Sequence, residues 1–276
     1  MNNLALNDDA AIPALGFDTY TLKGKRAVPI IAQAINLGYR LLDTAGQYEN
    51  EATVGAAIRN SGLARSQVFV SSKLPGRHHH YEEARQQIEE SLMAMGLDYF
   101  DLYLIHWPKP KQDLYVEAWQ ALIDAKKAGL IRSIGVSNFE PEHIDRLIKE
   151  TGVTPAVNQV ELHPYWSSQK VRAYDQQHHI VTEAWSPLLR GRNVFQEPLI
   201  RKLAAKYGKQ PAQIILRWET QLGVVTIPKA SSYVHQKSNL EIFDFKLTDD
   251  EVQAITALDK PDGRRQDRDP NKHEEF

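Results

Sequence analysis

Four residues that could move a proton lie at or just beyond the ends of short apolar runs. Asp43 follows the run at 39–42, Lys73 the run at 68–72 and His106 the run at 102–105, and Tyr48 lies shortly after Asp43. An ionisable group is expensive in an apolar interior unless a partner compensates it, so these positions indicate strand ends that meet around one cleft. We therefore expect the four side chains to share a site.

Together these residue types could deliver a proton to a carbonyl oxygen. A phenol with a pKa of about 10 needs a cation beside it, and Lys73 could stabilise the tyrosinate while Asp43 holds the ammonium. His106 could donate a hydrogen bond to the substrate oxygen. This chemistry suits the reduction of an aldehyde or ketone, and because no side chain carries a hydride, a nicotinamide cofactor is required. Taken alone, Asp43 and Lys73 fit a structural ion pair equally well.

The composition limits the classes of protein that the chain can belong to. With 276 residues, of which 42% are hydrophobic, the chain can form one large core, and we expect a single domain over 1–276. The net charge of -2 predicts neither a nucleic-acid nor a membrane partner. There are no cysteines, which excludes disulfides and thiolate metal sites, and there is no apolar run of about 18 residues. We expect a cytoplasmic monomer.

Apolar runs alternate along the chain with segments of helical spacing, the pattern of repeated strand–helix units. The expected strands lie at 14–17, 39–42, 68–72, 102–105, 131–136, 156–160, 180–184 and 224–227. The expected helices lie at 27–37, 50–60, 81–95, 114–127, 141–150, 168–178 and 211–222.

These units could form a closed barrel or an open doubly wound sheet. An open sheet that binds a dinucleotide usually has a Gly-rich turn after its first strand, and no such turn occurs here. Polar or aromatic residues follow strand after strand, and only a closed barrel would bring them around one pocket. We therefore predict a (β/α)8 TIM barrel with an N-terminal hairpin at 4–13. Extra helices are expected at 198–207 and at 248–258, where a capping box begins. The polar tail at 262–276 would be either disordered or a cover over the pocket.

Several longer motifs make the sequence resemble the aldo-keto reductase family over about residues 3–260. They are Leu-Asp-Thr-Ala at 42–45 with Tyr48, Ser-Lys-Leu at 72–74, Leu-Ile-His-Trp-Pro at 104–108, Ile-Gly-Val-Ser-Asn-Phe at 134–139, Asn-Gln at 158–159 with His-Pro at 163–164, and Ile-Pro-Lys at 227–229. Within the family, the segments 154–159 and 243–245 resemble the bacterial 2,5-diketo-D-gluconate reductase branch.

The resemblance implies a role for each matching residue. Tyr48 would be the general acid, with Asp43, Lys73 and His106 completing the catalytic set and with His106 and Trp107 at the substrate. The implied cofactor residues are Ser137, Asn138 and Gln159 at the carboxamide, Trp185 under the nicotinamide ring, Ser186, Pro187 and Leu188 at the pyrophosphate, and Lys229, Ala230, Ser231, His235 and Asn239 at the adenosine end. Lys229 favours NADPH, but His235 stands where the family often has Arg, so NADH is an alternative cofactor.

Two other functions are alternatives to carbonyl reduction. A nucleotide-sensing regulatory or binding subunit would use the same fold without turnover. A metal-dependent hydrolase would need converging carboxylate and histidine ligands, which the strand ends do not offer, so no metal site is expected. The run His78, His79, His80 predicts a solvated loop. The resemblance implies keto sugars such as 2,5-diketo-D-gluconate and small dicarbonyls as possible substrates. Residues near Pro75 depart from the family pattern, so the substrate pocket is expected to differ there.

Overall fold

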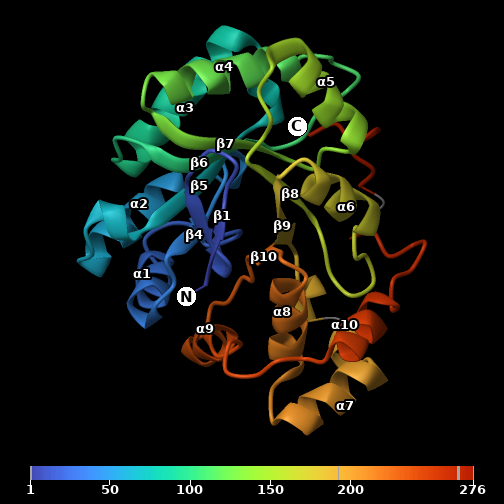
Figure 1. Ribbon diagram of the computed structural model, residues 1–276. Helices are drawn as coiled ribbons and strands as arrows, with labels where there is room; N and C mark the ends of the chain where they lie inside the picture. Colours follow the sequence, from blue (N-terminus) through green and yellow to red (C-terminus); the bar gives the residue numbers. More distant parts are fainter. Residues whose placement is uncertain (1, 192, 266–267, 276) are drawn as a thin grey trace.

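The computed structural model describes residues 2–191, 193–265 and 268–275. Eight strands form one parallel sheet in the order β10-β9-β8-β7-β6-β5-β4-β3, and helices surround it (Figure 1). The strands of this sheet are β3 (Gly16–Asp18), β4 (Leu41–Asp43), β5 (Phe69–Leu74), β6 (Phe100–Ile105), β7 (Ile131–Ser137), β8 (Val157–Glu161), β9 (Val181–Trp185) and β10 (Val225–Thr226).

The first and last strands of the sheet meet, so the sheet closes into a barrel. A parallel bridge pairs Leu15 with Thr226, and the Thr226 amide donates to the Ala14 carbonyl at 3.1 Å. Gly16 permits this closure, because a Cβ atom there would lie 2.6 Å from Leu41 Cγ and 2.9 Å from Ile227 Cγ2. The prediction of a (β/α)8 barrel is confirmed.

The helices lie close to the predicted ranges. They are α1 (Val28–Leu37), α2 (Glu51–Ser61), α3 (Tyr81–Met95), α4 (Tyr115–Lys127), α5 (Pro141–Thr151), α6 (Gln169–Gln177), α7 (Pro198–Tyr207), α8 (Pro211–Gln221), α9 (Tyr233–Leu240) and α10 (Asp249–Thr256). The expected capping box begins α10, since Thr248 Oγ1 accepts from the Glu251 amide and Glu251 accepts from the Thr248 amide. None of the helices in the described ranges is both long and apolar enough to cross a membrane.

Helix α9 was not predicted. Its buried residues are Gln236 and Asn239, so the segment lacks the apolar stripe by which a helix is found in a sequence. Gln236 Nε2 donates to the Ile30 and Ala230 carbonyls, and the Gln236 carbonyl accepts from the Tyr39 hydroxyl. Hydrogen bonds to the barrel therefore hold this helix in place.

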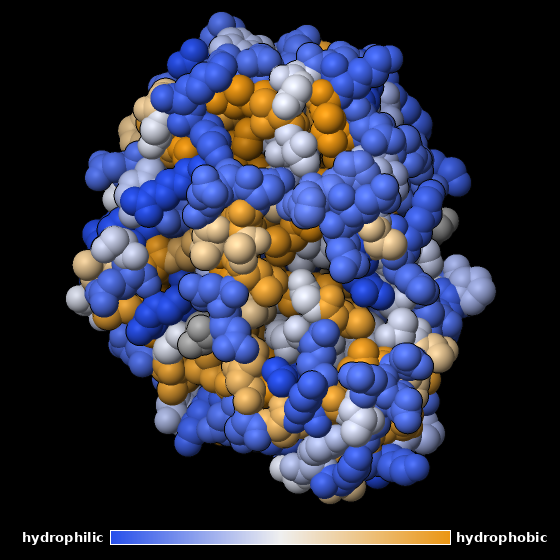
Figure 2. All heavy atoms as spheres, viewed as in Figure 1, coloured by the Kyte–Doolittle hydropathy of each residue, from blue (hydrophilic) through white to orange (hydrophobic). Residues whose placement is uncertain are grey.

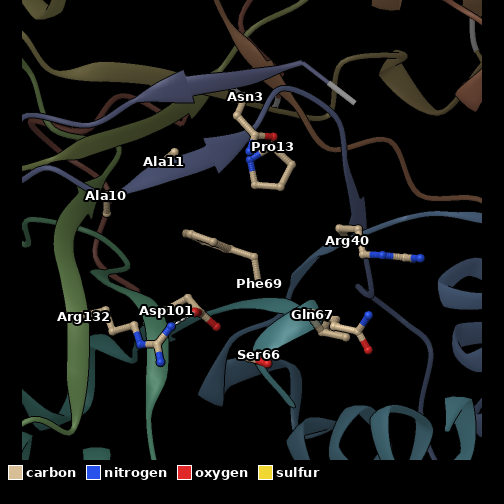
Figure 3. Close-up of a pocket in the computed structure, with 11 residues that line it drawn as sticks. Asn3, Ala10, Ala11, Pro13, Arg40, Ser66, Gln67, Phe69, Asp101 and Arg132 are labelled. Carbon is tan, nitrogen blue, oxygen red and sulfur yellow. Dashed lines mark hydrogen bonds and ion pairs between the residues drawn. The ribbon is translucent and has the colours of Figure 1, made fainter. Parts of the chain in front are cut away.

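The predicted hairpin consists of β1 (Asn3–Ala5) and β2 (Ala11–Pro13), which pair antiparallel. It covers the amino-terminal end of the barrel, where a cavity of about 560 Å³ lies between the hairpin and the start of β5. Phe69 projects into this cavity, with Arg40 to one side and Arg132 and Asp101 to the other (Figure 3). This cavity lies at the opposite barrel end from Asp43, Lys73 and His106.

Hydrophilic residues cover much of the outer helices, while hydrophobic residues gather across the middle of the face that Figure 2 shows. Inside, the large side chains of Trp119, Trp218, Tyr39 and Phe17 are fully buried. These side chains fill the space between helices and barrel and hold the strand ends in a fixed arrangement.

Asp175 in α6 offers a test of the packing beneath the site. Burial raises the pKa of this carboxyl from 3.8 to about 7, although the Thr182 hydroxyl and the Asn158 amide donate to it. Its folded-state pKa is raised, so its contribution to stability is lost as the pH rises from about 4 through about 7. We expect Asp175→Asn to increase the free energy of unfolding at pH 8 by on the order of 1–3 kcal/mol, and by less at pH 5.

Urea denaturation at the two pH values measures this effect. Asp145→Asn is the matched control, because Asp145 accepts from the Tyr174 hydroxyl at an exposed site on the neighbouring helix. A lower stability of Asp175→Asn at pH 8 would mean that the ionised carboxylate is required where it stands.

Candidate active site

Asp43 and Lys73 form a fully buried ion pair at the carboxyl end of the barrel. Asp43 ends β4, and Lys73 lies near the end of the neighbouring strand β5. Lys73 Nζ lies 2.6 Å from Asp43 Oδ2 and also donates to the Thr44 carbonyl at 2.9 Å. Both side chains are at most 1% exposed. Their burial and pairing match the expectation from the two strand ends.

Tyr48 and His106 lie beside this pair. A short 3-10 helix (Gly46–Tyr48) follows β4 and brings the Tyr48 ring to 5.1 Å from Lys73 Nζ. His106 follows β6 directly, and its ring centroid lies 5.9 Å from that of Tyr48 in an edge-on arrangement. The four residues that the sequence analysis singled out therefore converge on one end of the barrel.

Two further carboxyls, Asp18 and Glu183, share the same charge network. Gln159 Nε2 donates to Asp43 Oδ1 and to Glu183 Oε2, both at 2.9 Å. Burial and the charge of Asp43 raise the pKa of Glu183 to about 8 and that of Asp18 to about 7. Lys73 faces all three carboxyls and pairs directly with Asp43. Glu183 has no such partner among the described residues, so it keeps its proton at neutral pH.

The surroundings of Tyr48 keep its proton in place. Burial raises the pKa of Tyr48 well above its ordinary value, and the charges of Asp18, Asp43 and Glu275 raise it further. Lys73 Nζ lies 5.1 Å from the centre of the Tyr48 ring and is itself paired with Asp43 and the Thr44 carbonyl. Tyr48 is consequently neutral and carries its proton.

Asn138 connects His106 to Trp185. Its Nδ2 donates to the His106 carbonyl and to Ser137 Oγ, both at 3.0 Å, and its Oδ1 accepts from Trp185 Nε1 at 2.7 Å. Asn138 has a positive φ of 61°, which Asn tolerates better than most residues. The Ser137 hydroxyl donates to the Gln159 carbonyl at 2.8 Å. These four residues, Ser137, Asn138, Gln159 and Trp185, form a continuous polar surface around a half-buried indole, which fits a planar carboxamide-bearing ring.

The loop after β9 has an unusual backbone. Ser186, Leu189 and Arg190 all have φ between 47° and 57°, a conformation that is sparse for residues other than glycine. Pro187 is buried, and Ser186 and Leu188 are half-buried. The Arg190 guanidinium lies 5.5 Å from the Tyr20 ring, so the loop reaches toward β3 across the barrel end. Such a loop could cover an extended ligand that runs from Trp185 toward α9.

The predicted adenosine residues lie just before α9 and along it, with His235 in its first turn and Asn239 in its last. Lys229, Ser231 and His235 are exposed, whereas Ala230 and Asn239 are buried. Ser232 caps the helix by accepting from the His235 amide. In the described part of the chain, Lys229 forms no ion pair. An exposed, unpaired cation beside a helix amino terminus is suited to a phosphate group.

The polar tail lies over the site. The tail runs from α10 past α6 to the C label near α5 (Figure 1). The His273 ring lies 4.3 Å from the Trp107 ring, and Glu275 is 7% exposed. Of the two expectations for the tail, a disordered segment or a cover, the cover matches residues 268–275. Residues 266, 267 and 276 lie outside the described part of the chain.

The histidine run differs from its prediction as a solvated loop. His80 is exposed, but His79 is 1% exposed, and burial lowers its pKa to about 4. Pro75 and the short helix Gly76–His78 turn the chain so that His79 points inward, toward Glu275 and Lys109. Among the described residues, no group of three histidine or carboxylate side chains could hold a metal ion.

A cavity of about 330 Å³ adjoins Asn138 and Trp185. Trp166, Arg264 and Pro270 also line it, so the tail forms part of its wall. Arg264 pairs with Glu140 at 3.1 Å and with Asp269 at 3.4 Å. The Glu140 pair thus attaches the tail to the amino-terminal end of α5, while the Asp269 pair lies within the tail.

Sequence reasoning missed Asp18, Glu183 and Glu275 as members of the site. Glu183 could have been noticed, because it is a lone carboxyl within the apolar run at 180–184. Asp18 follows the first strand directly, as the predicted residues follow theirs. No pattern in the polar tail distinguishes Glu275 from the acidic residues around it.

Comparisons with known proteins agree with this geometry. Residues 14–260 match the model of the aldo/keto reductase family. The chain is 48% identical to 2,5-diketo-D-gluconic acid reductase B of Corynebacterium sp., covering 99% of this chain and 98% of that protein. It is 43% identical to methylglyoxal reductase DkgA of Escherichia coli, covering 97% and 96%.

Solved structures give the same result. A Gox0644 variant in complex with NADPH superposes with a TM-score of 0.94 at 38% identity, covering 99% of this chain and 98% of that one. An aldo-keto reductase of Bombyx mori in complex with NADP has a TM-score of 0.89 at 34% identity, with 99% and 97% covered. The chain therefore belongs to the aldo/keto reductase family.

Proposed function

We propose that the protein reduces an aldehyde or ketone to an alcohol, with NADPH as its cofactor, at the carboxyl end of the barrel. The oxidoreductase class follows from membership of the family, and the cofactor from the structural relatives solved with NADPH and NADP. The observation that carries the proposal is that the Tyr48 ring lies 5.9 Å from the His106 ring and 5.1 Å from Lys73 Nζ, which pairs with Asp43.

The bound cofactor supplies a hydride to the carbonyl carbon. Tyr48 then gives its proton to the carbonyl oxygen, which becomes strongly basic as negative charge develops on it. His106 donates a hydrogen bond that orients this oxygen. Lys73 stabilises the tyrosinate that remains, and Asp43 fixes the ammonium in position. The raised pKa of Tyr48 suits a donor that must hold its proton until the substrate becomes basic.

Substrates of this site are small dicarbonyls and keto sugars such as 2,5-diketo-D-gluconate. The proteins named 2,5-diketo-D-gluconic acid reductase B and methylglyoxal reductase DkgA support this choice, since both are closely related along nearly the whole chain. Trp107 is 4% exposed beneath His273 and forms an apolar wall beside His106. The carbonyl oxygen of a substrate could thus accept a hydrogen bond from His106 while the carbon chain contacts the Trp107 ring.

Turnover assays test the proposal. Oxidation of NADPH is followed with methylglyoxal, 2,5-diketo-D-gluconate and an aromatic aldehyde, and NADPH binding is measured separately by quenching of the intrinsic tryptophan fluorescence. Carbonyl-dependent oxidation is expected. Tight binding with no oxidation by any carbonyl would instead favour a nucleotide-sensing subunit.

Lys229 is the residue that we expect to distinguish NADPH from NADH. Loss of a charge-assisted contact with the 2'-phosphate should raise the KM for NADPH of Lys229→Ala about tenfold, with the KM for NADH unchanged. Lys237→Ala is the matched control, because Lys237 is also exposed but lies in the last turn of α9. Equal changes for the two cofactors would place the 2'-phosphate elsewhere.

The cytoplasmic monomer that the sequence predicts is part of the same proposal. Size-exclusion chromatography with light scattering should give a mass near 31.4 kDa. A dimer mass would contradict the monomer without affecting the proposed chemistry.

A further inference from the structure

Glu275, in the polar tail, places a carboxylate in the candidate active site. Its Oε2 accepts from the Gly76 amide at 2.8 Å, and its Oε1 lies 2.6 Å from His106 Nδ1. This second contact is a close ion-pair contact, although the Nδ1–H bond is not well aligned with the oxygen. The side chain is 7% exposed, and the carboxylate is therefore held within the protein.

Nitrogen-bearing groups surround this carboxylate, although His79 is neutral at neutral pH because burial lowers its pKa to about 4. His106, Lys109 and His79 face it together with the Gly76 amide, and we call these four groups the carboxylate seat. Lys109 is 4% exposed and donates to the Gly76 carbonyl at 3.2 Å. The charge of His106 and the Gly76 amide lower the pKa of Glu275, although burial opposes them. Glu275 is thus ionised, and it occupies a place that would suit any carboxylate.

The backbone at Gly76 also leaves room for the Glu275 side chain. A Cβ atom on Gly76 would lie 3.2 Å from Glu275 Oε2 and 2.4 Å from Lys109 Cδ, so only glycine leaves room for both side chains. The tail is fastened upstream, because His273 packs on Trp107 and its amide donates to the Asp269 carbonyl at 2.7 Å. Glu275 is therefore part of a docked segment next to His106.

We propose that Glu275 is a specificity-determining residue that selects neutral carbonyl substrates over those that carry a carboxylate next to the carbonyl. This inference rests on the proposed carbonyl reduction at Tyr48 and His106. A substrate carboxylate that approaches His106 must either displace Glu275 from the carboxylate seat or lie against its negative charge. A neutral dicarbonyl meets neither obstacle. Of the two substrate classes proposed above, the small neutral dicarbonyl is then the better one.

A matched pair of substrates isolates the effect of charge. Methyl pyruvate and pyruvate present the same ketone beside an ester or a carboxylate, and kcat/KM is measured for both with saturating NADPH. Intrinsic reactivity cancels when the acid-to-ester ratio of kcat/KM is compared between protein variants. We expect Glu275→Gln to raise this ratio about tenfold over the unsubstituted protein, and Glu275→Asp, which keeps the charge, to leave it within about threefold.

Glu274→Gln is the control, because it removes the same charge one residue earlier, from a carboxylate without a hydrogen-bond partner in the described part of the chain. The acid-to-ester ratio of kcat/KM for Glu274→Gln should stay within about twofold of that of the unsubstituted protein. Equal losses on ester and acid in Glu275→Gln, or an unchanged ratio, would overturn the inference and assign Glu275 a purely structural role. If no carbonyl substrate supports NADPH oxidation by the unsubstituted protein, the proposed function itself fails. That result differs from an unchanged acid-to-ester ratio.

Discussion

Tyr48→Phe should lower kcat for carbonyl reduction at least about a hundredfold, the scale of a lost general acid. The substitution removes one hydroxyl and leaves the ring that packs edge-on against His106 and Tyr20. Because the raised pKa of Tyr48 keeps its proton in place, this hydroxyl is the proton donor in the proposed mechanism. NADPH affinity should change little, since the predicted cofactor residues lie at or just after the ends of β7, β8 and β9 and in and before α9.

Tyr20→Phe is the matched comparison. Its ring centroid lies 5.0 Å from that of Tyr48, but its side chain is 42% exposed at the rim of the barrel. Single-turnover mixing with NADPH measures the chemical step directly and separates it from product release. Retention of more than a tenth of the rate by Tyr48→Phe would remove Tyr48 from the role of proton donor.

The barrel could be predicted because each of its signals is local in the sequence. Apolar runs ending in Asp43, Lys73 and His106 gave the strand positions, and the helices between them have apolar spacing. Their convergence followed from one physical statement, that the carboxyl ends of parallel strands face the same pocket. The absence of a Gly-rich turn then excluded the open sheet.

The parts that sequence reasoning missed depend on contacts between distant segments. Glu275 meets Gly76 across nearly the whole chain, and nothing in the tail's composition indicates which acidic residue docks. His79 lies in a run of three histidines, and only the turn at Pro75 decides which of them points inward. The number of carboxyls around the Lys73 ammonium is likewise a property of the assembled barrel, because Asp18 and Glu183 come from strands far apart in the sequence.

Because several carboxyls surround its one ammonium, Lys73 is the most informative residue to substitute after Tyr48. Lys73→Met leaves Asp43 buried without its cation, and removing one partner of a buried ion pair typically costs about 3–5 kcal/mol. Asp18 and Glu183 cannot compensate, because both are acids whose pKa values, about 7 and about 8, already reflect the charge of Asp43. We therefore expect Lys73→Met to lose several kcal/mol of stability in urea denaturation and at least about a hundredfold in kcat.

A second variant separates structure from catalysis. In Asp43→Asn with Lys73→Met the buried charges are removed together, and replacing such a pair by neutral groups of similar volume is often close to neutral for stability. Most of the free energy of unfolding should therefore return. If Lys73 stabilises the tyrosinate, kcat should stay low in the double variant even though the fold is restored. Recovery of turnover along with stability would instead mean that Asp43 and Lys73 are a structural ion pair, and that Tyr48 and His106 suffice to protonate the carbonyl oxygen.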